Sequence, residues 1–300
     1  MARIYNCTET VDFNNTSVAL GTFDGVHIAH VNIIKKAKEL AEANGLKCGI
    51  FTFDEIPANV ISCGNTPKLL KLDDKLKMFP EVDFVYVQKF DSDFMNMHPE
   101  DFVRYLKTKI KASQVTVGYN YRFGRNASAD AAVLKSLCSE AGIDVHICDK
   151  EQLCGAPVSS TRIRKLVMDG KVEEASILLG RPFHLSGTVI QGFQNGKKMG
   201  IPTANIFPET DMVCVKDGVY AGACRVGDKS YKAVINVGKN PTFDAKDTTI
   251  ECHLLDFDGD LYNKNIIVWF SKYIRDEIRF DTPKALAEQI LKDIEIAKNV

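Results

Sequence analysis

Several features that mark particular classes of protein are missing from this sequence. Its formal net charge is −1, so no basic surplus argues for a nucleic-acid partner. No two of its nine cysteines form a CxxC pair, which argues against zinc and favours free thiols in a reducing compartment. The N-terminus shows no signal pattern, and no apolar run reaches membrane-spanning length. We therefore expect a cytoplasmic protein that binds neither nucleic acid nor membrane.

The first half of the chain alternates short apolar stretches with stretches of helical periodicity. The expected strands are Ser17–Leu20, Lys47–Phe53, Phe84–Val87, Val115–Gly118 and Asp144–Cys148. The expected helices are about His27–Ala43, Pro99–Lys109 and Asp130–Ala141. Strands separated by helices predict an α/β domain with a parallel sheet and helices on its faces.

The pattern changes after about Gly180, where short β-rich runs follow one another closely. These runs are Gly187–Ile190, Val219–Val226, Lys232–Val237, Thr249–Phe257 and Asn265–Phe270. They predict an all-β domain, an antiparallel barrel or sandwich, closed by a terminal helix at Pro283–Lys298. We expect two domains, residues 1–183 and 184–300, joined near residues 181–186.

The segment Gly21-Thr-Phe-Asp-Gly-Val-His-Ile-Ala-His30 has the features of an anion site. Gly21 and Gly25 allow a tight turn that leaves the N–H groups of the following helix free to meet an anion. His27 and His30 lie three residues apart, so both point the same way from the first helical turn. Two imidazoles there could donate to the oxygens of a developing pyrophosphate. Taken alone, the segment could also be two surface histidines near a helix start.

A second anion-site candidate is Val158-Ser-Ser-Thr-Arg-Ile-Arg164, which opens an apparent helix. The hydroxyl and N–H groups of Ser159, Ser160 and Thr161 could share a phosphate at the helix N-terminus, and Arg164 adds positive charge. A plainly capped helix is the alternative interpretation of this segment by itself.

These two segments resemble the GxFDGxHxGH and SSTxIR elements of flavin adenylyltransferases, a family of nucleotidyltransferases. Val117–Gly124 looks like the family's VGxxFRFG element. The chain departs from the family pattern at Ala29, which replaces a Gly, and at Glu55 and Ile56, which replace Pro-His. The resemblance implies a Rossmann-like domain that transfers adenylyl from ATP to FMN, with His27 and His30 catalytic. It also implies ATP and FMN contacts at Gly21, Phe23, Asp24, Asn120, Ser159, Ser160, Thr161 and Arg164.

The second half carries Gly192-Phe-Gln-Asn-Gly-Lys-Lys-Met-Gly-Ile-Pro-Thr-Ala-Asn205. Its spacing fits neither a Walker loop nor a dinucleotide fingerprint. A Pro-fixed turn presents Thr203 and Asn205, two neutral oxygen ligands that suit Mg²⁺ when ATP phosphates supply the remaining partners. A generic surface hairpin is the alternative interpretation.

Further along, Thr249–Asp258 alternates in polarity, so Glu251 and His253 share one face of a strand. A carboxylate that points into a site can accept a proton from an attacking hydroxyl. Elsewhere in proteins, a Glu on such a strand usually faces solvent.

The GxPTAN element and this Glu resemble riboflavin kinases. The resemblance implies that Glu251 is the base for the riboflavin hydroxyl and that Thr203 and Asn205 hold metal and nucleotide. It places Gly192 and Lys197 near the ATP phosphates, although many bacterial members have Arg where Lys197 stands. It also makes Arg275 and Phe280 candidate flavin contacts.

From end to end the chain resembles the bacterial bifunctional riboflavin kinase/FAD synthetases. The resemblance implies that it phosphorylates riboflavin with ATP and Mg²⁺ and then adenylylates FMN to FAD. Two alternatives stay open on the sequence: a kinase with weak or lost FAD synthesis, because of Ala29, Glu55 and Ile56, and a non-catalytic flavin-binding regulator. Nothing in the sequence indicates an oligomeric state.

Overall fold

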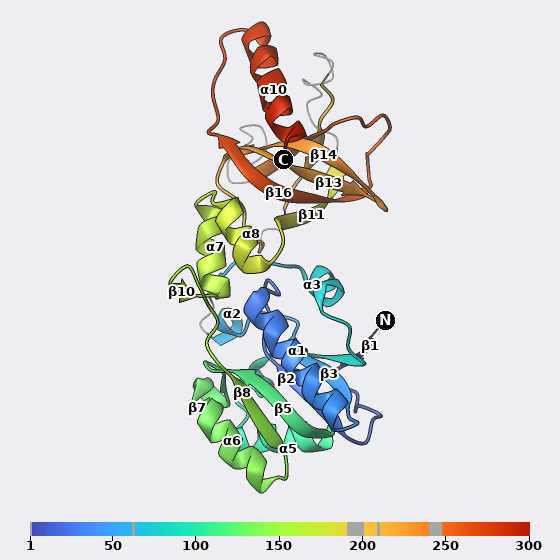
Figure 1. Cartoon of the computed structure of the whole chain (residues 1–300), viewed down its shortest axis with the longest axis vertical. Helices are drawn as coiled ribbons and strands as arrows, with labels where there is room; N and C mark the ends of the chain where they lie inside the picture. The colour runs from blue at the N-terminus through green and yellow to red at the C-terminus, as the bar shows by residue number, and fades with distance from the viewer. Residues whose placement is uncertain (1, 62–63, 191–200, 209–210, 240–247) are drawn as a thin grey trace. The chain divides into compact units, whose positions relative to one another are not determined.

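The computed structural model describes residues 2–61, 64–190, 201–208, 211–239 and 248–300 (Figure 1). By backbone contacts the chain divides into two compact units, Met1–Ser160 and Thr161–Val300. Each unit has its own sheet or barrel. No helix in the described residues is long and apolar enough to cross a membrane.

The first unit is built on a six-stranded parallel sheet with the order β1-β4-β3-β2-β5-β8. Its strands are β1 (Arg3–Asn6), β2 (Thr16–Leu20), β3 (Lys47–Phe53), β4 (Phe84–Gln88), β5 (Ala112–Gly118) and β8 (Asp144–Cys148). Two small hairpins add β6 (Arg122–Phe123), β7 (Ala129–Asp130), β9 (Gln152–Leu153) and β10 (Ala156–Pro157). The strand order reverses at β2, and in open α/β sheets ligands bind beyond the carboxyl ends of the strands at such a reversal.

Helices cover both faces of this sheet. They are α1 (Ile28–Ala43), α2 (Pro57–Ile61), α3 (Leu72–Met78), α4 (Ser92–Met95), α5 (Pro99–Thr108) and α6 (Ala131–Glu140), with a 3₁₀ turn at Arg125–Ala127. Helix α1 packs through Ile34 and Ala37 on the face that carries Ala19 of β2. The alternate face, which carries Val18 and Leu20, packs with residues of α5 and α6. This two-sided covering explains why β2 is buried throughout its length.

The second unit is a closed antiparallel barrel with the strand order β11-β12-β15-β14-β13-β16. Its strands are β11 (Phe183–Ile190), β12 (Ala204–Ile206), β13 (Gly218–Val226), β14 (Lys229–Lys239), β15 (Thr248–Leu254) and β16 (Asn265–Arg275). Helices α7 (Ser160–Met168) and α8 (Val172–Leu179) precede the barrel, and α10 (Pro283–Lys298) follows it.

Helix α10 lies on the outside of the barrel (Figure 1). Ile294 and Ala297 of α10 pack against Val219 and Ala221 of β13 and Val234 of β14. Thr282 caps the helix, because its hydroxyl accepts a hydrogen bond from the Ala285 N–H at 3.2 Å. One side of the barrel therefore has a second apolar layer over part of its outer surface.

The predicted fold class is confirmed: an α/β unit with a parallel sheet and an all-β unit with a terminal helix. The second unit is a barrel rather than a sandwich. Strand β15 ends at Leu254, short of the expected Phe257, because Asp256 turns the chain with a φ of 55°. The edge strand β1 was not predicted, because it has only four residues and exposes three of them, Ile4 included, so no buried apolar face marks it in the sequence. The domain boundary near residues 181–186 stays a prediction.

Candidate active sites

The turn after β2 holds two non-glycine residues in the left-handed region, Phe23 at φ 52° and Val26 at φ 39°. Such conformations are rare for bulky residues and concentrate at functional sites. The N–H of Val26 donates to the Phe23 carbonyl at 3.1 Å, which closes the turn. A Cβ on Gly21 would lie 2.9 Å from the Phe23 ring, so the ring can close over the turn only because Gly21 has no side chain.

His27 and His30 lie against each other at the start of α1. Their rings stack with centroids 3.5 Å apart. His27 is the N-cap residue, and its Nδ1 accepts a hydrogen bond from the His30 N–H at 3.3 Å. The Phe23 ring meets His30 edge-on, with centroids 5.3 Å apart. The three-residue spacing thus places both imidazoles together beyond the carboxyl end of β2.

His30 is a neutral imidazole at physiological pH. Burial, together with the nearby His27 and Lys75, holds the pKa of His30 well below its usual value. Its Nδ1 is buried and has no hydrogen-bond partner among the described residues. A neutral imidazole donates from one ring nitrogen only, so His30 can give a phosphate oxygen a hydrogen bond but no positive charge.

Asp24 holds the loops around this turn. Its carboxylate accepts the Leu69 N–H at 3.0 and 3.3 Å, and its backbone carbonyl accepts the Ser160 hydroxyl at 2.8 Å. The structure therefore brings Asp24 and Ser160 together from positions 136 residues apart. Asn120 is exposed in the turn after β5, the strand next to β2.

The Ser-Ser-Thr segment leads into α7, as predicted. Ser159 precedes the helix, which begins at Ser160. Thr161 is exposed on its first turn, and Arg164 is buried, with an exposed fraction of 8%. Thr161 and Arg164 belong to the second unit by backbone contacts.

Glu55 and Ile56, which depart from the family pattern, take part in local contacts. The Glu55 carboxylate pairs with the Lys68 amine at 2.8 Å and accepts the Ile56 N–H at 2.8 Å. Partial burial raises the pKa of Glu55, but the hydrogen bonds from Lys68 and Ile56 outweigh it, so the pKa is lowered. Glu55 is therefore a charged carboxylate at neutral pH.

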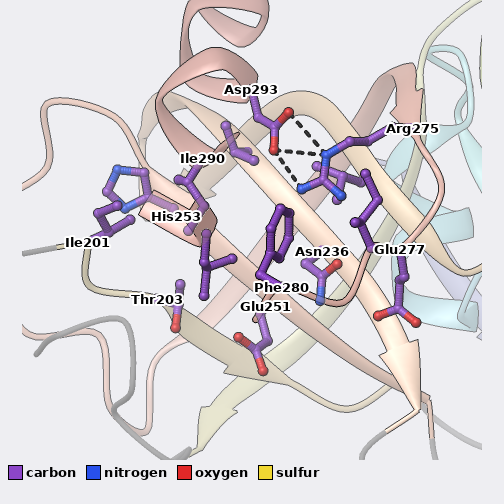
Figure 2. A pocket seen from close by; sticks show the side chains of 14 residues that line it. Ile201, Thr203, Asn236, Glu251, His253, Arg275, Glu277, Phe280, Ile290 and Asp293 are labelled. Atoms are coloured by element: carbon purple, nitrogen blue, oxygen red, sulfur yellow. Dashed lines mark hydrogen bonds and ion pairs between the residues drawn. The ribbon is translucent and has the colours of Figure 1, made fainter. Parts of the chain in front are cut away.

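A cavity of about 280 Å³ lies on the outer surface of the barrel beside α10 (Figure 2). One part of its wall is polar and the other is apolar. The lining residues are Ile201, Thr203, Val219, Val234, Asn236, Glu251, His253, Arg275, Glu277, Ile278, Phe280, Leu286, Ile290 and Asp293. An apolar cavity with a few convergent polar groups is typical of a small-molecule site.

Three neighbouring strands bring polar residues together, and two of these residues, Asn236 and Glu251, line the cavity. Glu251 on β15 pairs directly with Asn205 on β12 and with Asn236 on β14. Residues directly opposite in an antiparallel ladder share a face, so these three side chains lie side by side. His253 also lines the cavity, which confirms that it shares a face with Glu251. The His253 Nδ1 donates to the Pro202 carbonyl at 2.9 Å.

Two carboxylates in this cavity have raised pKa values. Burial, reinforced by the neighbouring Glu277, raises the pKa of Glu251. Burial and then Asp217 raise the pKa of Glu277, although a hydrogen bond from Asn236 opposes the shift. A Cβ on Gly238 would lie 2.2 Å from the Glu277 carboxylate, so Gly238 makes room for this side chain. A raised pKa makes Glu251 a stronger base than an exposed glutamate.

Arg275 forms an ion pair with the buried Asp293 of α10, drawn as dashed lines in Figure 2. Its Nη2 lies 2.8 Å and its Nε 3.2 Å from the Asp293 carboxylate, which also accepts from Gln289 at 3.0 Å. The Asp293 side chain is 1% exposed. The Arg275 guanidinium also lies 5.9 Å from the centre of the Phe280 ring. The pair therefore joins the end of β16 to α10 at the cavity.

The structure thus gathers Thr203, Glu251, Arg275 and Phe280 around one cavity and sets Asn205 beside Glu251. Gly192 and Lys197 lie outside the described residues. The sequence did not single out Glu277 or Asp293. A hint was available for Asp293, since Gln289 and Asp293 stand four apart on the predicted helix and such pairs hydrogen-bond.

The two halves of the chain match two different domain families of known proteins. Residues 10–162 match the sequence model for FAD synthetase, and residues 179–300 match the one for riboflavin kinase. A bifunctional riboflavin kinase/FMN adenylyltransferase of Listeria monocytogenes is 34% identical over 95% of this chain and 92% of its own length. Its counterparts in Bacillus subtilis and Escherichia coli K12 are each 33% identical over 92% of this chain, and over 89% and 90% of their own lengths. The chain belongs to the family of bifunctional riboflavin kinase/FMN adenylyltransferases.

A solved structure supports the fold along the whole chain. A protein of Streptococcus pneumoniae described as a macrolide-efflux protein has a TM-score of 0.88 and 29% sequence identity, and the match covers 99% of both chains. That name describes a different activity from the one shared by the bifunctional relatives. The FAD synthetase match covers most of the parallel sheet, and the riboflavin kinase match covers the barrel. Both families act on flavins.

Proposed function

We propose that this chain carries out two reactions at two separate sites, one in each half. The chain is a bifunctional transferase: it phosphorylates riboflavin with ATP to give FMN, and it adenylylates FMN with ATP to give FAD and pyrophosphate. The main support for a separate kinase site is the barrel cavity, in which Glu251 and Thr203 face an apolar wall. The stacked histidines lie on a separate α/β unit.

In the kinase site, Glu251 is the general base. The 5′-hydroxyl of riboflavin attacks the γ-phosphorus of ATP, its proton passes to the Glu251 carboxylate, and ADP leaves. The burial that raises the pKa of Glu251 favours this transfer, because the carboxylate holds the proton more tightly than an exposed one would. Arg275 and Phe280 contact the flavin, and Gly192 and Lys197 contact the ATP phosphates.

Thr203 and Asn205 would hold Mg²⁺ in this site. The described residues contain no group of three His, Cys, Asp or Glu side chains that could enclose a metal ion. Two neutral oxygen donors beside Glu251 fit Mg²⁺, which keeps waters and takes its remaining ligands from phosphates. The ion would neutralise charge on the transferred phosphoryl group.

In the adenylyltransferase site, a phosphate oxygen of FMN attacks the α-phosphorus of ATP, and pyrophosphate leaves. His27 and His30 donate hydrogen bonds to the phosphate oxygens as charge develops. A phosphate nucleophile is already ionised, so this site needs no general base. The nucleotide and FMN are held by the turn residues Gly21, Phe23 and Asp24, by Asn120, and by Ser159, Ser160, Thr161 and Arg164.

The assignment gives residues 1–183 to FAD synthesis and residues 184–300 to the kinase, in line with the matches at 10–162 and 179–300. We also place the enzyme in the cytoplasm. The eight cysteines within the described residues are free thiols, which fits a reducing compartment.

Supplying FMN directly tests the adenylyl-transfer activity apart from the kinase. With FMN, ATP and Mg²⁺, the purified chain should release FAD and pyrophosphate in equal amounts. Chromatography of the flavins measures the FAD that is formed. Riboflavin phosphorylation without any FAD from added FMN would instead favour an enzyme whose substitutions at Ala29, Glu55 and Ile56 have abolished adenylyl transfer. No turnover of either flavin would favour a flavin-binding regulator.

A further inference from the structure

Lys75, on the short helix α3, is a buried lysine beside the adenylyltransferase turn. Its exposed fraction is 6%. Its Nζ donates to three acceptors: the Phe53 carbonyl at 2.6 Å, the Thr52 hydroxyl at 3.2 Å and the Thr22 carbonyl at 3.3 Å. An ammonium group has three donors, so all three are used.

The three acceptors belong to two different strand ends. Thr22 lies in the turn after β2, between Gly21 and Phe23, whereas Thr52 and Phe53 end β3. The Thr52 hydroxyl itself donates to the Thr22 carbonyl at 3.0 Å. Lys75 therefore completes a small hydrogen-bonded cluster that ties the turn to the neighbouring strand.

Charged groups surround this ammonium on several sides. Lys75 lines a small cavity with the carboxylates of Asp24, Asp54 and Glu55 and with the amine of Lys68. Burial lowers the pKa of Lys75 to about 8, although Asp24 and Asp54 oppose the shift. The positive charge of Lys75 in turn helps to lower the pKa of His30. The lysine thus acts on both the turn and the histidine pair.

We propose that Lys75 is a positioning residue for adenylyl transfer: its ammonium fixes the turn after β2 against the end of β3, so that the turn and the histidine pair meet ATP in one geometry. This inference rests on the proposed assignment of the α/β unit to FAD synthesis. Without the three donors, the Thr22 carbonyl of the turn and the Thr52 hydroxyl and Phe53 carbonyl of β3 lose a buried partner. A displacement of about 1 Å at a reacting centre costs about a hundredfold in rate.

A Lys75→Met variant tests the proposal, because methionine keeps the length of the side chain but has no donor and no charge. We expect the kcat of FAD synthesis to fall by about 10- to 100-fold, with the KM for ATP changed by less than about threefold. The riboflavin kinase rate of the same molecules should stay within about twofold of the parent, because the kinase site belongs to the other unit. An unchanged far-UV circular dichroism spectrum and an unchanged Tm should show that the α/β unit of the variant is folded. Lys77→Met is the matched control, because Lys77 stands on the same helix with its side chain 72% exposed; it should leave both reactions unchanged.

A kcat of FAD synthesis within about twofold of the parent in folded Lys75→Met would overturn the proposal, and so would an equal loss of both activities.

A second measurement, the pH dependence of FAD synthesis, needs no variant. The neutral amine has lost its charge and one donor, so the kcat of FAD synthesis by the parent chain should fall above about pH 8 while the kinase rate does not. His30 titrates far below this range and does not produce that decline.

A rate of FAD synthesis that is flat well above that pH would contradict a role for the ammonium. Failure of the functional assignment gives a different result, since the parent chain would then make no FAD from FMN at any pH. Each outcome therefore separates the role of Lys75 from the activity of the site.

Discussion

A Glu251→Gln variant should lose riboflavin phosphorylation by about 10²- to 10⁴-fold in kcat, the usual contribution of a general base. Glutamine has nearly the same shape as glutamate and can occupy the same place between Asn205 and Asn236 on the barrel. It cannot accept the hydroxyl proton at neutral pH, so the loss should fall on kcat, with a smaller change in the KM for riboflavin. The rate of FMN formation under saturating riboflavin and ATP measures the effect.

The same protein supplies an internal control for this variant. FAD synthesis from added FMN should continue at the parental rate, because the histidine pair belongs to the other unit. Glu277→Gln is the matched substitution, since Glu277 is a second carboxylate in the same cavity; its effect on kcat should be much smaller. A Glu251→Gln enzyme that phosphorylates riboflavin at the parental rate would show that Glu251 is not the base.

Asp293→Asn should destabilise the second unit by about 3 kcal/mol, the lower end of the cost of removing one partner from a buried ion pair. The Asp293 carboxylate is 1% exposed and is the acceptor for Arg275 and Gln289. Asparagine keeps the volume but leaves the Arg275 charge without its counter-charge at the junction of β16 and α10. Urea unfolding followed by the fluorescence of the single tryptophan, Trp269 on β16, reports on this unit.

Kinase activity should fall with this stability change, because Arg275 and Asp293 both line the cavity. Glu295→Gln is the control: Glu295 is on the same helix and pairs with Lys298, but its side chain is 67% exposed. Exposed pairs of this kind contribute about 1 kcal/mol or less. If Asp293→Asn unfolds at the same urea concentration as Glu295→Gln, the buried pair does not anchor α10.

The sequence predicted the parts of this molecule in which a local pattern is repeated. Two strands and one helix have the predicted limits, because apolar content or helical periodicity marks them in the sequence. They are Lys47–Phe53, Asp144–Cys148 and Pro283–Lys298. Alternation along β15 correctly placed Glu251 and His253 on one face. The spacing of His27 and His30 correctly placed their rings together. The chemical roles came from a family resemblance, since spacing alone left a surface hairpin and a capped helix open.

Other features could not be predicted because they depend on contacts between distant segments. Lys75 resembles its neighbours Lys71 and Lys77 in the sequence, and only the strand order brings it to Thr22 and Phe53. The pairing of Arg275 with Asp293 depends on how α10 packs on the barrel. The left-handed backbone of Phe23 is likewise set by the surrounding turn, because the residue itself disfavours it.

We propose that one chain holds two sites that act on flavins in succession. A time course with riboflavin, ATP and Mg²⁺, with flavins separated by chromatography, tests it most directly. We predict that FMN appears first and without delay, and that FAD follows after a lag at the expense of FMN. Riboflavin that stays unphosphorylated while nucleotide and magnesium are in excess would contradict the account.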